Sequence, residues 1–123
     1  MHELGIIVHV AKTLKHVALQ ENVSKIGSVT LEIGEVSGIV ESYLTDCWEY
    51  YRKKKEYIAK AEKDELIEDS KLIIEKIEAV TYCDDCEKTY PTVQYGRQCP
   101  YCKGYNTWLA VGNECNIKEI EAC

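Results

Sequence analysis

The stretch Cys83-Asp84-Asp85-Cys86, separated by twelve residues from Cys99-Pro100-Tyr101-Cys102, decides the fold of this chain. Two Cys-x-x-Cys pairs at this separation are the ligand pattern of a tetrahedral zinc site. Each pair turns two thiolates toward one point, and the intervening segment brings the second turn over to face the first. We expect Pro100 to stiffen the second turn and Gly104 to supply a positive φ there.

Four sulfur ligands would leave no open coordination position on the metal. We therefore predict that Cys83, Cys86, Cys99 and Cys102 hold a structural Zn(II), and that the chain is not an enzyme and has no catalytic residues. A hydrolytic zinc enzyme would need three protein ligands and a bound water. Two disulfides, or a redox pair, are the alternative, and a titration of bound zinc against free thiols separates them.

Composition limits the other classes of function. The chain has 123 residues, of which 46% are hydrophobic, and it carries a formal net charge of −6. The acidic charge argues against nucleic acid as a partner, and no apolar run is long enough to span a bilayer. Seven cysteines without a secretory signal indicate the reducing cytoplasm. We interpret the basic run 52–55 as a solvated helix face.

Hydrophobic periodicity predicts two helices and a strand before the cysteine pairs. The first helix runs from His2 to about Glu21, and its expected buried stripe is Leu4, Ile7, Val8, Ala11, Leu14 and Ala18. In the strand that follows, Val29, Leu31 and Ile33 alternate with Thr30, Glu32 and Gly34. The second helix starts near Glu41 and extends to about residue 63, with a stripe of Tyr43, Leu44, Cys47, Trp48 and Tyr51.

A strand over 71–80 then leads directly into the first cysteine pair. After the second pair, extended chain over 108–122 is broken at Gly112-Asn113, and its last part alternates apolar and polar residues, so it is expected to return to the first sheet. The fold class predicted is α+β: a small sheet with two helices plus an inserted four-cysteine module that is zinc-ribbon-like. The expected domains are 1–80 with 108–123, and 81–107 for zinc.

The histidines His2, His9 and His16 lie seven residues apart, which is about 10.5 Å of helical rise and too far for two of them to share one ion. His9 and His16 are therefore expected to face solvent. His2 differs because the amine of Met1, the amide nitrogen of His2 and its imidazole Nδ1 can close two fused chelate rings, with Glu3 completing a planar set. Such a set suits Ni(II) or Cu(II). A histidine at position two also arises by chance, so that alternative stays open.

Four motifs occur here in a particular order: Met1-His2-Glu3-Leu4, the segment 31–38 (LEIGEVSG), the two cysteine pairs, and Gly112-Asn113-Glu114 before an Ile/Glu-rich strand. In these motifs the chain resembles the HypA/HybF family of hydrogenase nickel-incorporation proteins over nearly its whole length. The segment 48–67 is longer and richer in Lys and Glu than is usual there. Val40-Glu41 stands where relatives often have proline, and Glu41 is a second carboxylate that can reach nickel or simply start a helix.

The resemblance implies a cytoplasmic nickel metallochaperone with a structural zinc and a transient Ni(II) on the Met1 amine, His2 and Glu3. It implies delivery to the large subunit of a NiFe hydrogenase, with a HypB-type GTPase as helper, and some members also supply urease. A zinc-ribbon module that bridges proteins without transferring nickel is the alternative function. The sequence leaves open which nickel enzyme is served, the roles of Cys115 and Cys123, and whether the chain forms a homodimer.

Overall fold

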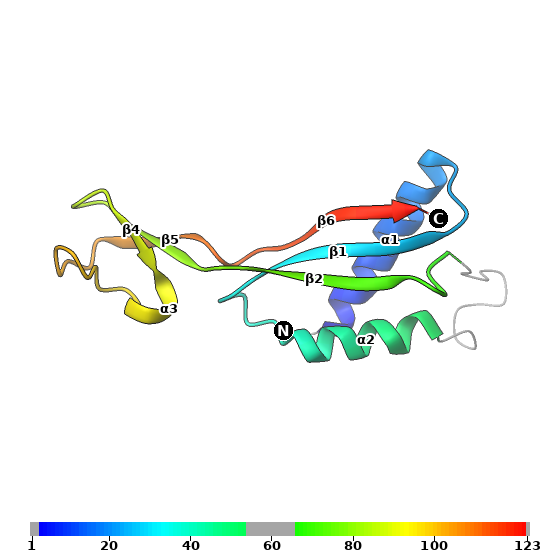
Figure 1. Ribbon diagram of the computed structural model, residues 1–123, viewed down its shortest axis with the longest axis horizontal. Helices are drawn as coiled ribbons and strands as arrows, with labels where there is room; N and C mark the ends of the chain where they lie inside the picture. Colours follow the sequence, from blue (N-terminus) through cyan, green and yellow to red (C-terminus); the bar gives the residue numbers. More distant parts are fainter. Residues whose placement is uncertain (1–2, 54–65, 123) are drawn as a thin grey trace. The chain divides into compact units, whose positions relative to one another are not determined.

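The computed structural model of the protein describes residues 3–53 and 66–122 (Figure 1). The chain divides into two compact units: Met1–Leu31 with Ile39–Ile74 and Ile117–Cys123, and Glu32–Gly38 with Glu75–Asn116. The elements in chain order are α1 (Glu3–Glu21), β1 (Ile26–Gly34), α2 (Glu41–Lys53), β2 (Lys71–Ile77), β3 (Val80–Cys83), β4 (Thr89–Pro91), α3 (Thr92–Tyr95), β5 (Thr107–Val111) and β6 (Cys115–Ala122).

Helix α1 packs against α2 through one apolar face. Its buried residues are Ile7, Val10, Ala11, Leu14 and Ala18. The predicted stripe was wrong at two positions, because Leu4 is 44% exposed and Val8 is only half-buried. Val8 lies about 100° around the helix from Ile7, so it falls at the border of the face, and Val10 packs on the other side. Asn22 ends the helix with a φ of 56°, a left-handed conformation that asparagine tolerates.

Strand β1 is the middle strand of a sheet with the order β2-β1-β6. The return of the last strand to the first sheet is thereby confirmed. The predicted alternation is only half right, since Thr30 and Ser28 are each 8% exposed and therefore as buried as their apolar neighbours. A middle strand is flanked on both sides, and short polar side chains there are shielded by the longer side chains of the strands beside them.

Helix α2 buries Leu44 and Trp48 completely. Tyr43 was wrongly placed in the buried stripe, because it is 60% exposed, and Cys47 is half-buried. The indole Nε1 of Trp48 donates to the carbonyl oxygen of Ser70 over 3.1 Å. This bond satisfies the single polar atom of the largest buried side chain.

The basic run is less solvated than predicted at its first residue. The side chain of Arg52 is 20% exposed, its Nη1 donates to the carbonyl oxygen of Glu68 over 2.6 Å, and its Nε donates to Glu49 Oε1 over 3.1 Å. The Arg52 guanidinium holds the pKa of Glu49 below its ordinary value through these contacts. Lys53 is 65% exposed, and residues 54–63, to which the second helix was predicted to extend, lie outside the described residues.

Replacing Trp48 with phenylalanine is expected to lower the free energy of unfolding by about 1–3 kcal/mol, because the carbonyl of Ser70 loses its donor and the smaller ring leaves a gap. Urea unfolding followed by circular dichroism measures it. Tyr43→Phe on the same helix is the matched control and should change stability by less than about 0.5 kcal/mol. Equal effects at both positions would contradict the burial of Trp48.

The predicted strand over 71–80 is wrong as a single element. Strand β2 belongs to the sheet β2-β1-β6, whereas β3 belongs to a second sheet with the order β4-β3-β5. Glu78 and Ala79 interrupt the extended chain between them, and Ala79 is fully buried. The chain therefore leaves one sheet and enters the other within two residues, which an unbroken hydrophobic pattern does not reveal.

Three segments of the chain cross closely in the second unit. Gly34 donates its N–H to the carbonyl of Glu114, Glu35 to that of Ile77, and Val36 to that of Gly112. Two carboxylates add hydrogen bonds to the backbone of these segments. Glu35 Oε1 accepts the N–H of Ala79 over 3.0 Å, and Glu114 Oε1 accepts the N–H of Gly112 over 2.7 Å. These bonds join the chain on both sides of the cysteine module to the end of β1.

Candidate metal centre

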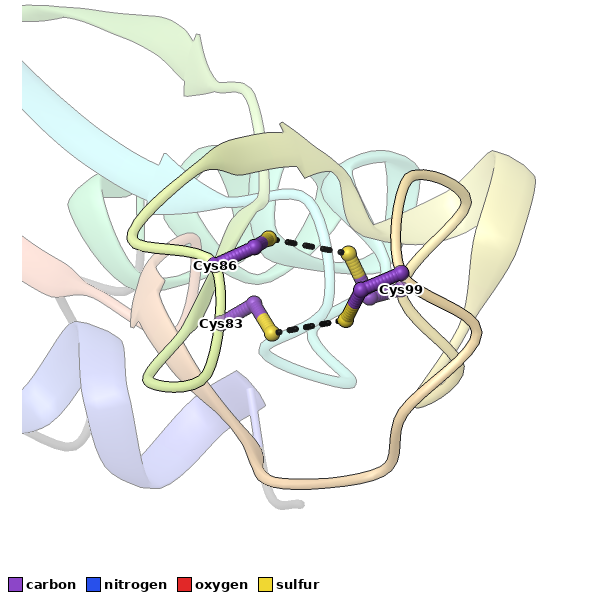
Figure 2. Close-up of side chains that lie close together, drawn as sticks. Cys83, Cys86 and Cys99 are labelled. Carbon is purple, nitrogen blue, oxygen red and sulfur yellow. Dashed lines mark hydrogen bonds between the residues drawn. The ribbon is translucent and has the colours of Figure 1, made fainter.

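The two cysteine pairs come together as predicted (Figure 2). The Sγ atoms of Cys83 and Cys102 are 3.6 Å apart, those of Cys86 and Cys99 are 3.5 Å apart, and all four lie within 4.8 Å of one another. Four sulfurs placed tetrahedrally around zinc at about 2.3 Å would be separated by about 3.8 Å. The sulfur arrangement therefore fits a tetrahedral metal ion, with one ligand atom from each cysteine.

Both turns use the same backbone geometry. In the first, Glu87 donates its N–H to the carbonyl of Cys83; in the second, Lys103 donates to the carbonyl of Cys99, both over 2.9 Å. Glu87 and Lys103 have φ angles of 58° and 64°, so each turn reverses in the left-handed region directly after its second cysteine. Each of these two bonds joins residues four positions apart, so this part of the turn geometry is local.

The role predicted for Gly104 was wrong, because the positive φ falls on Lys103 instead. Gly104 is needed for space. A Cβ on Gly104 would lie 3.1 Å from Asp85 Oδ2 and 3.3 Å from the sulfur of Cys102. Its carbonyl also accepts the N–H of Cys99 over 3.0 Å. A side chain here would press on the sulfur of Cys102 and on Asp85 in the first turn.

Residues between and beyond the cysteines hold the first turn, and sequence reasoning did not single them out. Asn106 Nδ2 donates to Asp85 Oδ1, and Trp108 Nε1 donates to Asp84 Oδ1, each over 3.2 Å. Asp84 also donates its N–H to the carbonyl of Asn106. Two aspartates inside a Cys-x-x-Cys pair were the available signal, since short side chains that accept hydrogen bonds stabilise turns.

The module has a small core of its own. Its buried cluster consists of Cys83, Tyr90 and Cys99, with Cys86 packed against it. The hydroxyl of Tyr90 donates to the carbonyl of Gly96 over 2.9 Å. A cluster with a single aromatic ring buries little apolar surface for three short strands, which is typical of small modules that a bound metal ion stabilises.

The thiols differ in acidity. Burial, followed by the hydrogen bond to Cys99, raises the pKa of Cys86 to about 12. Burial also opposes the ionisation of Cys99, but the backbone amides of Cys102 and Tyr101 donate to its sulfur and lower its pKa to about 7. Backbone amides directed at a cysteine sulfur stabilise the thiolate, which is the form that binds metal.

The other predicted site residues lie elsewhere in the chain. Met1 and His2 fall outside the described residues. Glu3 is at the start of α1, and its Oε2 accepts the backbone N–H of Val40 over 3.1 Å. Val40 directly precedes α2, whose first turn contains Glu41. The structure therefore places the carboxylate of Glu3 at the amino end of α2, a contact between residues 37 positions apart that the sequence did not suggest.

The other histidines and cysteines among the described residues are not members of the cluster. His9 and His16 are exposed on α1, as predicted. Cys47 lies half-buried on α2 and Cys115 is exposed at the start of β6, while Cys123 is outside the described residues. Within residues 3–53 and 66–122, the four-cysteine cluster is the one group of side chains spaced to hold a metal ion.

A comparison with models of known protein families finds a match over nearly the whole chain. The family model described as "Hydrogenase/urease nickel incorporation, metallochaperone, hypA" matches residues 1–122. The chain belongs to the HypA family. Since the match includes both the amino terminus and the two cysteine pairs, the resemblance seen in the motifs holds over the whole chain.

Named HypA proteins are similar along nearly their full length. The hydrogenase maturation factor HypA of Dehalococcoides mccartyi is 31% identical over 121 residues, which cover 98% of this chain and 93% of that protein. The hydrogenase maturation factor HypA of Geobacter metallireducens is also 31% identical, with 98% of each chain covered. The long segment before residue 67 therefore lies inside the family's full-length alignment.

Solved structures show the same fold. The Ni metallochaperone HypA from Helicobacter pylori superimposes with a TM-score of 0.69 over 99% of this chain and 97% of that chain, at 23% identity. A second HypA solution structure gives a TM-score of 0.72 over 100% and 97%, also at 23% identity. The predicted α+β class with an inserted four-cysteine module is thereby confirmed. No helix among the described residues is both long and apolar enough to cross a bilayer.

Proposed function

We propose that this chain carries Ni(II) on its amino terminus and delivers it to the large subunit of a NiFe hydrogenase during maturation, while a structural Zn(II) fills the four-cysteine site. The family match over residues 1–122 carries the proposal. It is supported by the division of donor types: four sulfurs close one site, and a nitrogen-rich set stands at the start of the chain.

The zinc site is proposed to be structural because all four positions are filled by sulfur. A resident zinc would supply the positive charge that keeps the half-buried Cys86 ionised despite its raised pKa. With no open position, such an ion can neither bind a water nor exchange with cargo. The cysteines would hold the turns in place, and nickel would bind elsewhere.

Nickel, as cargo, is proposed to bind the amine of Met1, the amide nitrogen and Nδ1 of His2, and an oxygen or nitrogen of Glu3. Binding requires the amine and the His2 amide to lose their protons, so nickel uptake should release protons to solvent. The carboxylate of Glu3 can accept the Val40 N–H and still offer lone pairs to a metal. This contact would fasten the proposed site to the start of α2.

The proposed partners follow the family. A HypB-type GTPase would assist the transfer, the hydrogenase large subunit would receive the ion, and pairing of two copies is one further option. The chain acts in this proposal as a carrier in the cytoplasm and not as an enzyme. Ligands on a terminal segment would suit a carrier, because a recipient must compete for the ion ligand by ligand.

Removing the chelate should remove nickel binding. We expect His2→Ala, or a short tag that blocks the Met1 amine, to weaken Ni(II) binding by more than the 10- to 100-fold that loss of an outer-shell group typically causes. Calorimetric titration of the zinc-loaded protein measures it. His16→Ala, at an exposed histidine on α1, is the matched control and should bind like the parent.

Two results would contradict the amino-terminal site. Parent-like nickel binding by either blocked variant would show that the ion sits elsewhere. No nickel binding by the untagged parent would favour the alternative, a zinc-containing module that bridges proteins without carrying nickel. Zinc content should be the same in every variant, since the four cysteines are unchanged.

A further inference from the structure

One face of the sheet β4-β3-β5 carries two aromatic rings, the half-buried Tyr82 and the exposed Trp108. Tyr82 on β3 pairs in register with Trp108 on β5 and with Thr89 on β4, so these side chains share a face. The neighbouring positions Thr81 and Cys83 point to the other face, where they are buried. The two rings lie 5.4 Å apart between centroids and are tilted by 49°, and Trp108 is 52% exposed.

Carboxylates border the same rings. The indole Nε1 of Trp108 donates to Asp84 Oδ1, which fixes this carboxylate at the edge of the aromatic pair. Asp84, Asp85 and Glu87 are all exposed within four consecutive positions. The nearest basic residue in sequence, Lys88, has its Nζ over the ring of Tyr101, 4.9 Å from the centroid. The face therefore combines two π surfaces with an excess of negative charge.

This combination is complementary to a guanidinium group. A planar cation stacks on tryptophan or tyrosine faces and at the same time donates forked hydrogen bonds to a carboxylate. Arginine does both, whereas lysine offers a point charge, and a phosphate backbone would be repelled by the carboxylates. The hydrogen bond to Asp84 alone would not require half of the indole to be left in water.

We propose that the face formed by Tyr82 and Trp108, with Asp84 and Glu87 beside it, docks an arginine-bearing segment of a partner protein. The proposal goes beyond nickel carriage and does not depend on it, because every residue named belongs to the second unit and none is a proposed nickel ligand. The partner is defined by its chemistry: an extended basic segment that presents guanidinium groups to an acidic, aromatic sheet face.

The two tryptophans of the chain make a direct test possible. We expect a short peptide of alternating arginine and glycine, added to the zinc-loaded, nickel-free protein, to shift the indole N–H signal of Trp108 in an NMR proton–nitrogen correlation spectrum. The signal of Trp48, which is fully buried, should stay in place. The same peptide with lysine should bind more weakly, and the peptide with glutamate should not bind.

Matched variants distinguish binding at this face from a general attraction of the basic peptide to an acidic protein. Asp84→Asn with Glu87→Gln should weaken the arginine peptide by about three- to tenfold in calorimetry, since each exposed charge pair contributes modestly. Asp84→Asn keeps the oxygen that accepts from Trp108. The control, Glu78→Gln with Glu119→Gln, removes the same charge at exposed positions and should bind like the parent.

The aromatic contribution has its own pair of variants. Trp108→Leu should weaken the peptide at least as much as the charge variant, and Tyr105→Leu, at a residue that is 71% exposed, should not. Zinc content confirms that the second unit of each variant folds, and the Trp48 signal confirms that the first unit does. Equal weakening by the control variants, equal binding of lysine and arginine peptides, or no shift of the Trp108 signal would each overturn the proposal.

Discussion

Replacing Cys83 with serine is expected to remove zinc from the protein and to unfold the module around β3, β4 and β5. A structural zinc contributes on the order of 10 kcal/mol to the fold that binds it. The buried cluster of the module otherwise contains Tyr90 and the cysteines themselves, so little apolar burial is left to replace that contribution. Metal analysis should show that zinc falls from one ion per chain to nearly none.

The loss should be confined to the second unit. The indole signal of Trp108, which depends on Asp84 in the first turn, should move to its unfolded position. The Trp48 signal should persist, because its contacts in the first unit do not involve the cysteines. Cys115→Ser is the matched control: this exposed cysteine is outside the cluster, and its variant should keep zinc and fold. A folded, zinc-loaded Cys83→Ser protein would refute the four-sulfur site.

Replacing Gly112 with alanine is expected to lower the free energy of unfolding by about 3–5 kcal/mol. Gly112 has a φ of 122°, and a Cβ there would lie 2.4 Å from the Cα of Ala79 and 2.5 Å from its Cβ. Backbone strain costs about 1–3 kcal/mol and overpacking a similar amount. The atoms in the way belong to a buried residue, so neither side of the contact can move aside.

Gly38→Ala separates strain from crowding. Gly38 has a φ of 80°, but nothing lies within 4 Å of a Cβ added there, so this variant should show the strain alone, about 1–2 kcal/mol. Urea unfolding of the zinc-loaded proteins, followed by circular dichroism, gives both values. If Gly112→Ala costs no more than Gly38→Ala, the close crossing of Ala79 and Gly112 is wrong.

The four-cysteine cluster was predictable because much of its geometry is local. Each turn is closed by a hydrogen bond between residues four positions apart, so the spacing inside a pair sets the direction of its sulfurs. The exposed His9 and His16 followed from helical periodicity in the same way. The Met-His-Glu start supplied a nickel hypothesis through chelate chemistry and through the family motif, and this hypothesis awaits the titration.

Hydrophobic periodicity gave wrong predictions where another element of the fold determines whether a residue is buried or where a strand ends. Val8 and Val10 are equally apolar, but Val10 is buried and Val8 only half-buried, because burial depends on which face of α1 other elements cover. Thr30 is buried because β1 is the middle strand, although its sequence alternates like that of a strand with one wet face. The change of sheet at Ala79 depends on Gly112, which is distant in sequence, and an isoleucine-rich run carries no sign of it.

The sequence by itself therefore determined the four-sulfur cluster, through two short spacings, and it supplied the nickel hypothesis for the first three residues. Tertiary structure alone decided what surrounds them. It set Glu3 against the amide of Val40 and Trp108 against Asp84, pairs that are 37 and 24 residues apart. Ligand chemistry is a property of residue type and local spacing, whereas such contacts exist only after distant segments have packed.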